Sequence, residues 1–275
     1  MSLTTLIRTP EIRELFSQEF EKPEIGLSTS IIAPPICKNP TMVGTAYDYV
    51  LRFMLQRKYE CMFFHPWVAE QSLARLSNLD DKIKGYRIVT NALANLNSYL
   101  KTGKIELGLL RSAIGLAQLD MIYRAGTDGE NLGSISKDDL LDLNRLTEIT
   151  NLKLFRPKEL IFLNPTFKEA SRLVGGADAD LLIDDCLVEI KTTNRARFDR
   201  DTFNQLIGYY VLSMIGGISF YSQSGQPKIK RLGVYYSRYA QIVSFRVSQI
   251  ATLKEMKRFV RHFKKIIEKN QPYVF

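Results

Sequence analysis

The stretch GGADADLLIDDCLVEIKTT, residues 175–193, decides how the rest of the chain is interpreted. Its apolar residues predict two short β-strands, over 172–183 and 186–193, joined by a turn at Asp184 and Asp185. Acidic residues and a lysine nevertheless lie inside these strands, where a core strand normally carries no charge. These charged positions are the feature that any functional interpretation has to explain.

A symmetric turn at this point places Asp180 opposite Glu189 and Asp178 opposite Lys191. Because side chains alternate along a strand, all four side chains are expected on one face of the sheet. Two carboxylates about 5 Å apart repel each other by roughly 3 kcal/mol at an effective dielectric constant near 20. A bound divalent cation would offset that repulsion, and Lys191 beside it could orient or deprotonate an attacking water, or stabilise negative charge.

A structural alternative stays open for the same residues. Asp180 and Glu189 could form a solvated sheet edge that Lys191 simply neutralises. The spelling Glu-x-Lys is also weak evidence by itself, since Glu255 and Lys257 repeat it in a helical segment where i and i+2 do not face each other.

Two further groups of polar residues follow the second strand. Gln205 and Tyr209 are four residues apart in a predicted helix and share one face of it, where they suit hydrogen bonding to a nucleotide or a phosphate. Arg195 and Arg197, in the connecting segment, could contact phosphates. The same residues have structural explanations that stay open. Gln205 and Tyr209 could be polar positions of an ordinary helix, and the arginines could be solvated loop residues.

The periodicity of the remaining sequence divides the chain into two parts. We expect an α/β (α+β) fold in one domain, residues 1–275, with a helical portion over approximately 41–155 and an α/β core over 156–275. Residues 1–40 are mixed and end in the loop-like stretch IIAPPICKNP with its prolines. Helices are expected over 41–59, 67–79, 80–103, 111–126, 134–150, 199–215 and 251–270, and strands over 159–167, 230–239 and 240–247.

Composition limits the class of protein. The 275 residues carry a formal net charge of +9, which favours a polyanionic partner such as nucleic acid. The three cysteines form no CxxC pair, so the sequence indicates neither a zinc site nor a disulfide framework. Neither a signal peptide nor a membrane span is indicated, so we expect a cytoplasmic protein without a membrane partner.

Taken in order, these motifs resemble the PD-(D/E)xK nuclease superfamily. Asp180, Glu189-Ile190-Lys191 and the trailing Gln205-x-x-x-Tyr209 are similar to the RecB-like exonuclease branch, which includes the nucleases of CRISPR spacer acquisition. Gly176 stands in the place of that branch's glycine before the aspartate. The specific match covers mainly residues 159–215, with a fainter one in GTAYDYVLRF, where Gly44 precedes Asp48.

The resemblance implies a fold and a set of roles. The fold would be a restriction-endonuclease-like core with a central mixed sheet flanked by helices, and the helical portion would be an N-terminal or inserted region. Asp48, Asp180, Glu189 and the backbone carbonyl of Ile190 would hold Mg²⁺ or Mn²⁺, and Lys191 would activate or orient the attacking water. Gln205 and Tyr209 would shape the site and touch DNA, single- or double-stranded. The two histidines, His65 and His262, match no motif position.

The sequence departs from the pattern in three ways. It lacks the iron–sulfur cysteines of the CRISPR-associated relatives, and it lacks a P-loop, so a motor would come from a helicase or another protein partner. Asp178 is an additional acid that either pairs with Lys191 or serves a second metal.

The function that these features predict is metal-dependent hydrolysis of phosphodiester bonds in DNA, in repair or defence, by a PD-(D/E)xK-type deoxyribonuclease. Two alternatives stay open. One is a catalytically silent nuclease-fold module that binds nucleic acid or a partner protein. The other is a metal-dependent phosphohydrolase acting on small substrates.

Overall fold

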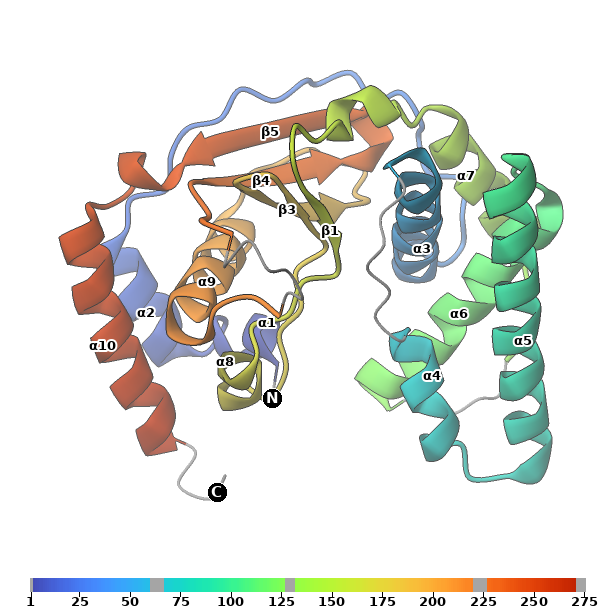
Figure 1. Ribbon diagram of the computed structural model, residues 1–275, viewed down its shortest axis with the longest axis horizontal. Coiled ribbons are helices and arrows are strands. Elements are labelled where there is room, and N and C mark those ends of the chain that lie inside the picture. The colour runs from blue at the N-terminus through green and yellow to red at the C-terminus, as the bar shows by residue number, and fades with distance from the viewer. Residues whose placement is uncertain (1, 60–66, 127–131, 220–226, 271–275) are drawn as a thin grey trace.

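The structure is a computed structural model, and it describes residues 2–59, 67–126, 132–219 and 227–270. Within them, five strands form one mixed sheet in the order β1-β2-β3-β4-β5, with helices on both sides. The mixed α/β class expected from the sequence is therefore confirmed. Figure 1 shows the sheet spanning the top of the molecule, with α9, α2 and α10 below one end and α3 to α7 at the other.

The sheet is an antiparallel hairpin unit joined to a second hairpin through one parallel pair. Strands β1, β2 and β3 pair antiparallel, β3 and β4 pair parallel, and β4 and β5 pair antiparallel. Leu181 pairs with Val188 and Ile183 with Cys186, which is the register expected for a symmetric turn at residues 184 and 185. The strands are β1 (Ile161–Leu163), β2 (Leu181–Ile183), β3 (Cys186–Lys191), β4 (Arg231–Tyr236) and β5 (Gln241–Arg246).

The crossover from β3 to β4 is the helix α9, Arg200–Gly216. Asp199 caps its start, because the side chain accepts a hydrogen bond from the backbone N–H of Thr202. Near its end, a Cβ added at Gly216 would lie 2.3 Å from the carbonyl oxygen of Phe167, so only glycine fits there. This helix was predicted from the sequence, and the prediction is confirmed.

The other helices belong to two groups. Those of the helical portion follow the periodicity expected over residues 41–155, although the segment predicted over 67–79 forms only a short helix and a 3₁₀ turn. The α-helices are α1 (Leu3–Leu6), α2 (Pro10–Glu19), α3 (Pro40–Tyr59), α4 (Val68–Ser72), α5 (Leu79–Thr102), α6 (Leu107–Ala125), α7 (Lys137–Glu148), α8 (Glu169–Leu173) and α10 (Leu253–Asn270). The 3₁₀ helices are Leu73–Arg75, Leu152–Phe155, Ser237–Tyr239 and Val247–Gln249.

Each face of the sheet is covered by a different core. Leu181, Val188 and Ile190 point into the core that α3 to α7 build. Leu182 and Leu187 point into the core of α9, α10 and the N-terminal helices. The alternation of β2 and β3 therefore joins both halves of the chain, and the helical portion packs directly on the sheet.

Local structure differs from expectation in three places. The mixed residues 1–40 were assigned no element, but α1 and α2 form there and bury Phe16 and other apolar side chains in the core of α9 and α10. The strand expected over 172–183 is confined to β2, because α8 ends at Leu173 and Gly176 has a φ of +124°, which favours glycine. The strand expected over 159–167 is confined to β1.

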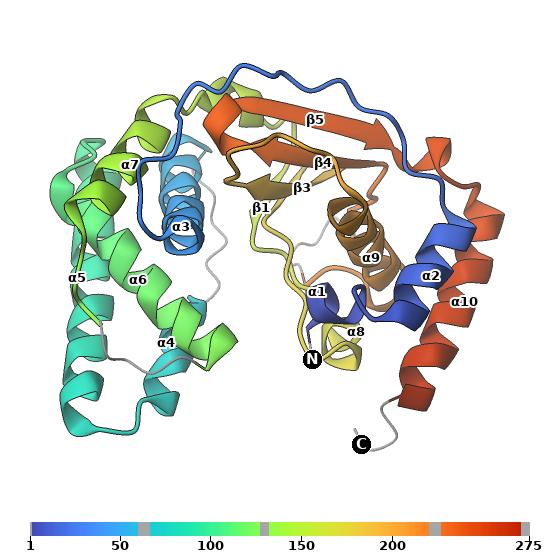
Figure 2. The ribbon, with the colours of Figure 1, turned by 180° about the vertical axis from the view of Figure 1, so that it is seen from behind.

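A buried ion pair fastens the two halves together. Arg238 follows β4, and its guanidinium donates to both carboxylate oxygens of Asp142 on α7, at 2.7 and 3.0 Å. Both side chains are almost fully buried. The extended segment between α2 and α3 runs along β5 and is held there by hydrogen bonds from Ile32 and Ala33 to the carbonyl of Arg238 (Figure 2).

Candidate active site

The charged residues of β2 and β3 line a cleft of about 660 Å³, here called the site cleft. Its walls come from α1, α3, α6, α9, β3 and the segment before β2. The four residues expected on one face of the hairpin, Asp178, Asp180, Glu189 and Lys191, all line it, together with Ile190. Asp48 of α3 and Gln205 and Tyr209 of α9 line it too. The fold thus brings these sequence-predicted residues together from three separate segments.

Asp180 sits just before β2 and holds the hairpin together at this end. Its Oδ2 accepts a hydrogen bond of 2.6 Å from the backbone N–H of Ile190. The β2–β3 ladder itself ends at Leu181 and Val188, so the pairing does not continue to Asp180 and Glu189 as expected. The side-chain bond to Ile190 takes the place of that ladder step.

Glu189 is the centre of a buried hydrogen-bond network. Its Oε1 accepts from Lys191 Nζ and from Gln205 Nε2, both at 2.9 Å. Lys191 Nζ also donates to Gln205 Oε1 at 2.9 Å, and Gln205 Nε2 lies 2.8 Å from Tyr209 Oη. The one-turn spacing of Gln205 and Tyr209 on α9 therefore places both beside the carboxylate, as the sequence predicts.

Burial and charge set the protonation of these groups. Burial, followed by the charges of Glu189 and Asp48, raises the pKa of Asp180 well above its usual range. Burial likewise raises the pKa of Asp48 to about 6, against the opposing effect of Arg52. Burial disfavours the charge on Lys191, but Glu189 together with Asp180 and Asp199 outweighs it and raises the pKa of that ammonium. Lys191 is therefore a cation at neutral pH and a donor rather than a base.

Two carboxylate oxygens in the cleft have no hydrogen-bond partner among the described residues. They are Oδ1 of Asp48 and Oε2 of Glu189, and both are buried. A buried oxygen of an acid without a donor is costly, so such atoms call for a ligand. Carboxylate oxygens and a backbone carbonyl are the donor set that Mg²⁺ and Mn²⁺ prefer. In these respects the residues fit a hard divalent cation.

The described residues do not contain a preformed metal cluster. Within them, no three His, Cys, Asp or Glu side chains are grouped closely enough to hold a metal ion. One of the acids is already paired, because the guanidinium of Arg52, one turn after Asp48 on α3, forms an ion pair with the Asp48 carboxylate. Arg52 was not predicted as a neighbour of the site, although its i, i+4 spacing from Asp48 indicates the pair.

Asp178 does not contact Lys191 as one of the two sequence interpretations required. Its carboxylate pairs with Arg124 of α6 at 3.2 Å, and Arg124 also pairs with Asp120 one turn earlier on the same helix. Asp120 is buried and accepts a hydrogen bond from the hydroxyl of Tyr49. Arg124 and Asp120 line the site cleft and were missed, because more than 50 residues of sequence separate them from the hairpin.

Arg195 and Arg197 line a smaller cleft of about 270 Å³, which shares Lys191 and Gln205 with the site cleft. Tyr236 of β4, the register partner of Lys191, also lines it. The Tyr236 hydroxyl is buried and has no partner among the described residues. Burial and then Asp199 raise its pKa to about 12, so it is a neutral donor. No sequence pattern indicates Tyr236 as a site residue, because the parallel register of β3 and β4 brings it there.

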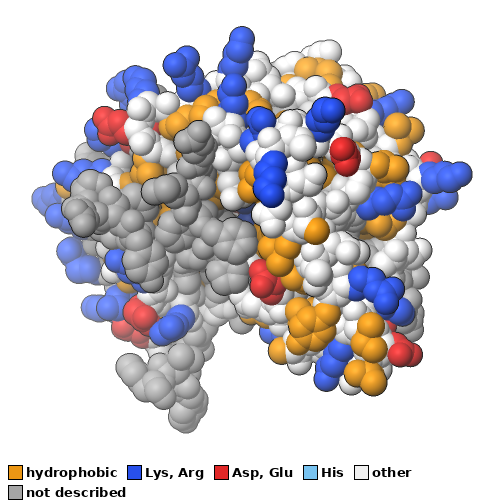
Figure 3. Space-filling view, turned by 45° about the vertical axis from the view of Figure 1, so that its right-hand side comes forward, with side chains coloured by type: hydrophobic (Ala, Val, Ile, Leu, Met, Phe, Trp, Pro, Cys, Tyr) orange, Lys and Arg blue, Asp and Glu red, His pale blue; other side chains and the backbone are white. Residues whose placement is uncertain are grey.

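Among the described residues, the other candidates, His262, Cys37 and Cys186, do not line the site cleft. His65 and Cys61 lie outside the described residues. His262 is on α10, and neither Cys37 nor Cys186 is in a disulfide. Lys and Arg side chains are spread over the face drawn in Figure 3, and carboxylates are the less common charged groups on it.

Comparison of the chain with protein-family models, with curated proteins and with solved structures finds no match. Among the described residues, none of the helices combines the length and the apolar character needed to cross a bilayer.

Proposed function

We propose that the protein is a metal-dependent nuclease that hydrolyses phosphodiester bonds in DNA. The observation that carries this proposal is the buried carboxylate of Glu189, which has one oxygen held by Lys191 and Gln205 and the other without a partner among the described residues. Asp180 lies beside it, close enough for the charge of Glu189 to raise the pKa of Asp180. A purely structural ion pair needs neither the second acid nor the unpartnered oxygen.

The arrangement of elements supports a finer proposal for the fold, a restriction-endonuclease-like core. An antiparallel unit of β1, β2 and β3 is followed by the crossover α9 and by β4, parallel to β3. The acidic and basic residues of the PD-(D/E)xK pattern lie at the end of this unit, against α9. The resemblance to the RecB-like branch therefore has a compatible framework here, with α3 to α7 as the helical region.

Asp180, Glu189, Asp48 and the carbonyl of Ile190 would hold Mg²⁺ or Mn²⁺. A cation bound there would supply Lewis-acid stabilisation of phosphate charge and lower the pKa of an attacking water. The pKa values of Asp48 and Asp180 are raised, so these carboxyl groups hold their protons more tightly than usual. Each would have to release its proton before it could bind a cation.

The protein's own residues then position and stabilise the reacting groups. Lys191, held as an ammonium by Glu189, donates to a phosphate oxygen and offsets the negative charge that grows as water attacks phosphorus. Gln205 fixes the orientation of both side chains. Arg195, Arg197 and the hydroxyl of Tyr236 would contact the neighbouring phosphates from the adjoining cleft. Because the chain has no P-loop, a helicase or another motor protein would be a separate partner.

One observation favours a second candidate, a silent nuclease-fold module that binds nucleic acid or a protein. The pairing of Arg52 with Asp48 neutralises one of the three acids, and no preformed three-ligand cluster occurs among the described residues. In such a module, Arg52 would replace the cation.

Cleavage of labelled DNA separates the two candidates. Single- and double-stranded, linear and circular substrates are incubated with Mg²⁺, Mn²⁺ or EDTA, with wild type and with Lys191→Ala. The nuclease proposal expects metal-dependent cleavage that falls at least about 100-fold in the variant. Lys84→Ala is the matched control, because it removes a lysine–aspartate pair on α5, and its activity should equal that of wild type. Binding of DNA without cleavage under every condition would favour the silent module.

A further inference from the structure

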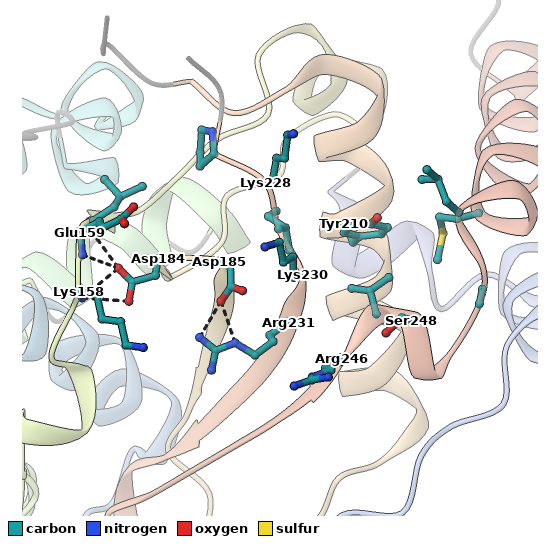
Figure 4. A pocket seen from close by; sticks show the side chains of 17 residues that line it. Lys158, Glu159, Asp184, Asp185, Tyr210, Lys228, Lys230, Arg231, Arg246 and Ser248 are labelled. Carbon is teal, nitrogen blue, oxygen red and sulfur yellow. Dashed lines mark hydrogen bonds and ion pairs between the residues drawn. The ribbon is translucent and has the colours of Figure 1, made fainter. Parts of the chain in front are cut away.

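A second, larger cleft lies at the opposite end of the sheet from the site cleft. It has a volume of about 1320 Å³ and is called here the turn-side cleft, because the turn between β2 and β3 forms one wall. The segments before β1 and β4, the end of β5 and the start of α10 form the others (Figure 4). Strand β3 runs from this end to Lys191, so its length of roughly 17 Å separates the two clefts.

The walls of the turn-side cleft carry more cations than anions. Arg231 is neutralised by Asp185, with 2.7 Å between the guanidinium and the carboxylate. The other cations form no ion pair with any residue that the structure describes, and they are Lys158, Lys228, Lys230 and Arg246. Because they come from three separate segments, their meeting is a property of the fold rather than of one basic run.

The acids that line the cleft are too few to neutralise these cations. Asp185 is committed to Arg231. The carboxylate of Asp184 accepts hydrogen bonds from the backbone N–H groups of Lys158, Glu159 and Leu160, at 2.9 to 3.1 Å. Among the described residues that line the cleft, Asp184 and Glu159 are thus the two carboxylates that oppose four cations.

The strand register places two arginines directly opposite each other in this cleft. Arg231 of β4 pairs with Arg246 of β5. Like charges directly opposite on neighbouring strands destabilise a sheet, and Asp185 compensates only Arg231. Figure 4 shows Arg246 extending on the same side as Arg231 and the Asp185 carboxylate. A bound anion beside Arg246 would remove the remaining repulsion.

The floor between the cations is apolar. It includes the partly buried ring of Tyr210 on α9, with Ile229, Val247 and Met256, and Leu253 at the rim is 60% exposed. A DNA or RNA duplex presents phosphate and sugar to a protein, because its bases are stacked inside. A duplex over the turn-side cleft would therefore leave the apolar floor in contact with water. An unpaired base instead offers an apolar face that stacks on an aromatic ring, while its phosphates reach the surrounding cations.

We propose that the turn-side cleft binds a single-stranded segment of nucleic acid, as a second site separate from the site cleft. The phosphates contact Lys230, Arg246 and the lysines beside them, and one base stacks on Tyr210. This inference goes beyond the proposed hydrolysis, because binding at this end of the sheet requires neither a metal nor cleavage. The protein would then bind a nucleic-acid strand at a distance from the phosphodiester bond that is cut.

The test measures binding of a fluorescent oligothymidylate of about 20 nucleotides by anisotropy, in EDTA and over a range of salt concentrations. The variant Lys230→Gln/Arg246→Gln removes two phosphate contacts, so the slope of log K against log salt should fall by about 1.4. At about 0.1 M salt, the same change corresponds to roughly 25-fold weaker binding. Arg87→Gln/Lys101→Gln on α5 removes the same charge from exposed positions and should retain both slope and affinity.

A second pair of variants tests the stacking contact. Tyr210→Leu should weaken binding about 5-fold or more, and Tyr210→Phe should not, since the phenyl ring still stacks. Thermal unfolding of each variant checks that the fold is intact. The inference is overturned if the cleft variants bind like the α5 control, if duplex DNA shows the same losses as the single strand, or if polyglutamate binds in place of the oligonucleotide.

Failure of the proposed nuclease would leave a different signature. Without catalysis, the wild type would cut no substrate, yet the salt slope would still depend on Lys230 and Arg246. The converse outcome is cleavage that depends on Lys191 while the salt slope is unchanged in the turn-side cleft variants. That result would support the nuclease proposal and contradict the proposed second site.

Discussion

The pH dependence of stability offers a sharp test of the buried acid Asp48. Burial raises its pKa from the ordinary 3.8 to about 6. Because the folded-state pKa is the higher one, protonation favours the fold: this stabilisation is complete below about 3.8 and is lost as the pH rises through 6. Asp48→Asn has no such titration. The metal-free wild type should therefore gain stability relative to the variant as the pH falls from 7 to 5.

The size of this gain follows from the two pKa values. At pH 5 the folded protein holds the Asp48 proton almost completely, whereas the unfolded chain has largely released it. The linkage relation gives a relative gain of about 1.3 kcal/mol in the free energy of unfolding between pH 7 and pH 5. Saturating Mg²⁺ should reduce the gain, since a cation stabilises the ionised carboxylate.

Urea unfolding at a series of pH values in EDTA, followed by circular dichroism, measures the difference. Asp138→Asn on α7 is the control for removing one negative charge from the surface. A difference between wild type and Asp48→Asn that stays constant between pH 7 and pH 5 would refute the reasoning, because Asp48 would then not be a buried acid in the site cleft.

Three further substitutions test separate parts of the structure. Tyr236→Phe removes a buried, unpartnered hydroxyl, so unfolding by urea should show unchanged or slightly higher stability, by up to about 1 kcal/mol, while DNA affinity falls. Asp142→Ala leaves the Arg238 guanidinium buried without its carboxylate and should cost about 3–5 kcal/mol in the same measurement. Gly216→Ala places a Cβ 2.3 Å from the carbonyl of Phe167 and should cost at least about 1–3 kcal/mol, seen as a lower melting temperature.

Matched controls sharpen these three expectations. Asp138→Ala breaks an exposed pair with Lys38 and should cost less than about 1 kcal/mol, in contrast to Asp142→Ala. Gly44→Ala meets only an ordinary contact with Thr192 and should not lower the melting temperature. For Tyr236→Phe, a loss of stability together with unchanged DNA affinity would show that the hydroxyl has a structural role.

The sequence predicted the parts of the fold that local patterns determine. The register of the β2–β3 hairpin follows from two apolar runs of matching length around a two-residue turn. The start of α9 follows from Asp199 as its cap, and the one-turn spacing of Gln205 and Tyr209 put both beside Glu189. Helix α8 escaped prediction because it is short and its last two residues, Arg172 and Leu173, fall in the stretch that was predicted as a strand. Helices α1 and α2 are short, and their stability comes from packing against α9 and α10.

Contacts between distant segments could not be predicted from the sequence. The ion pair between Arg124 of α6 and Asp178 forms only because the folded chain brings α6 next to the segment before β2. The same holds for Tyr236, which reaches the site through the parallel pairing of β3 with β4. Arg52 differs, since its spacing from Asp48 was readable, but the competition of an arginine with a cation for one carboxylate is a property of the folded site.

The most direct test of the central claim is the rate of single-turnover cleavage of one labelled DNA strand in Mn²⁺ by wild type and by Glu189→Gln. The substitution keeps the size of the side chain and removes the charge on which both the cation and Lys191 depend. The account predicts cleavage by wild type and a loss of at least about 100-fold in the variant, with the fold retained. Equal rates in the two proteins would contradict it, and so would a wild type that binds the strand and never cuts it.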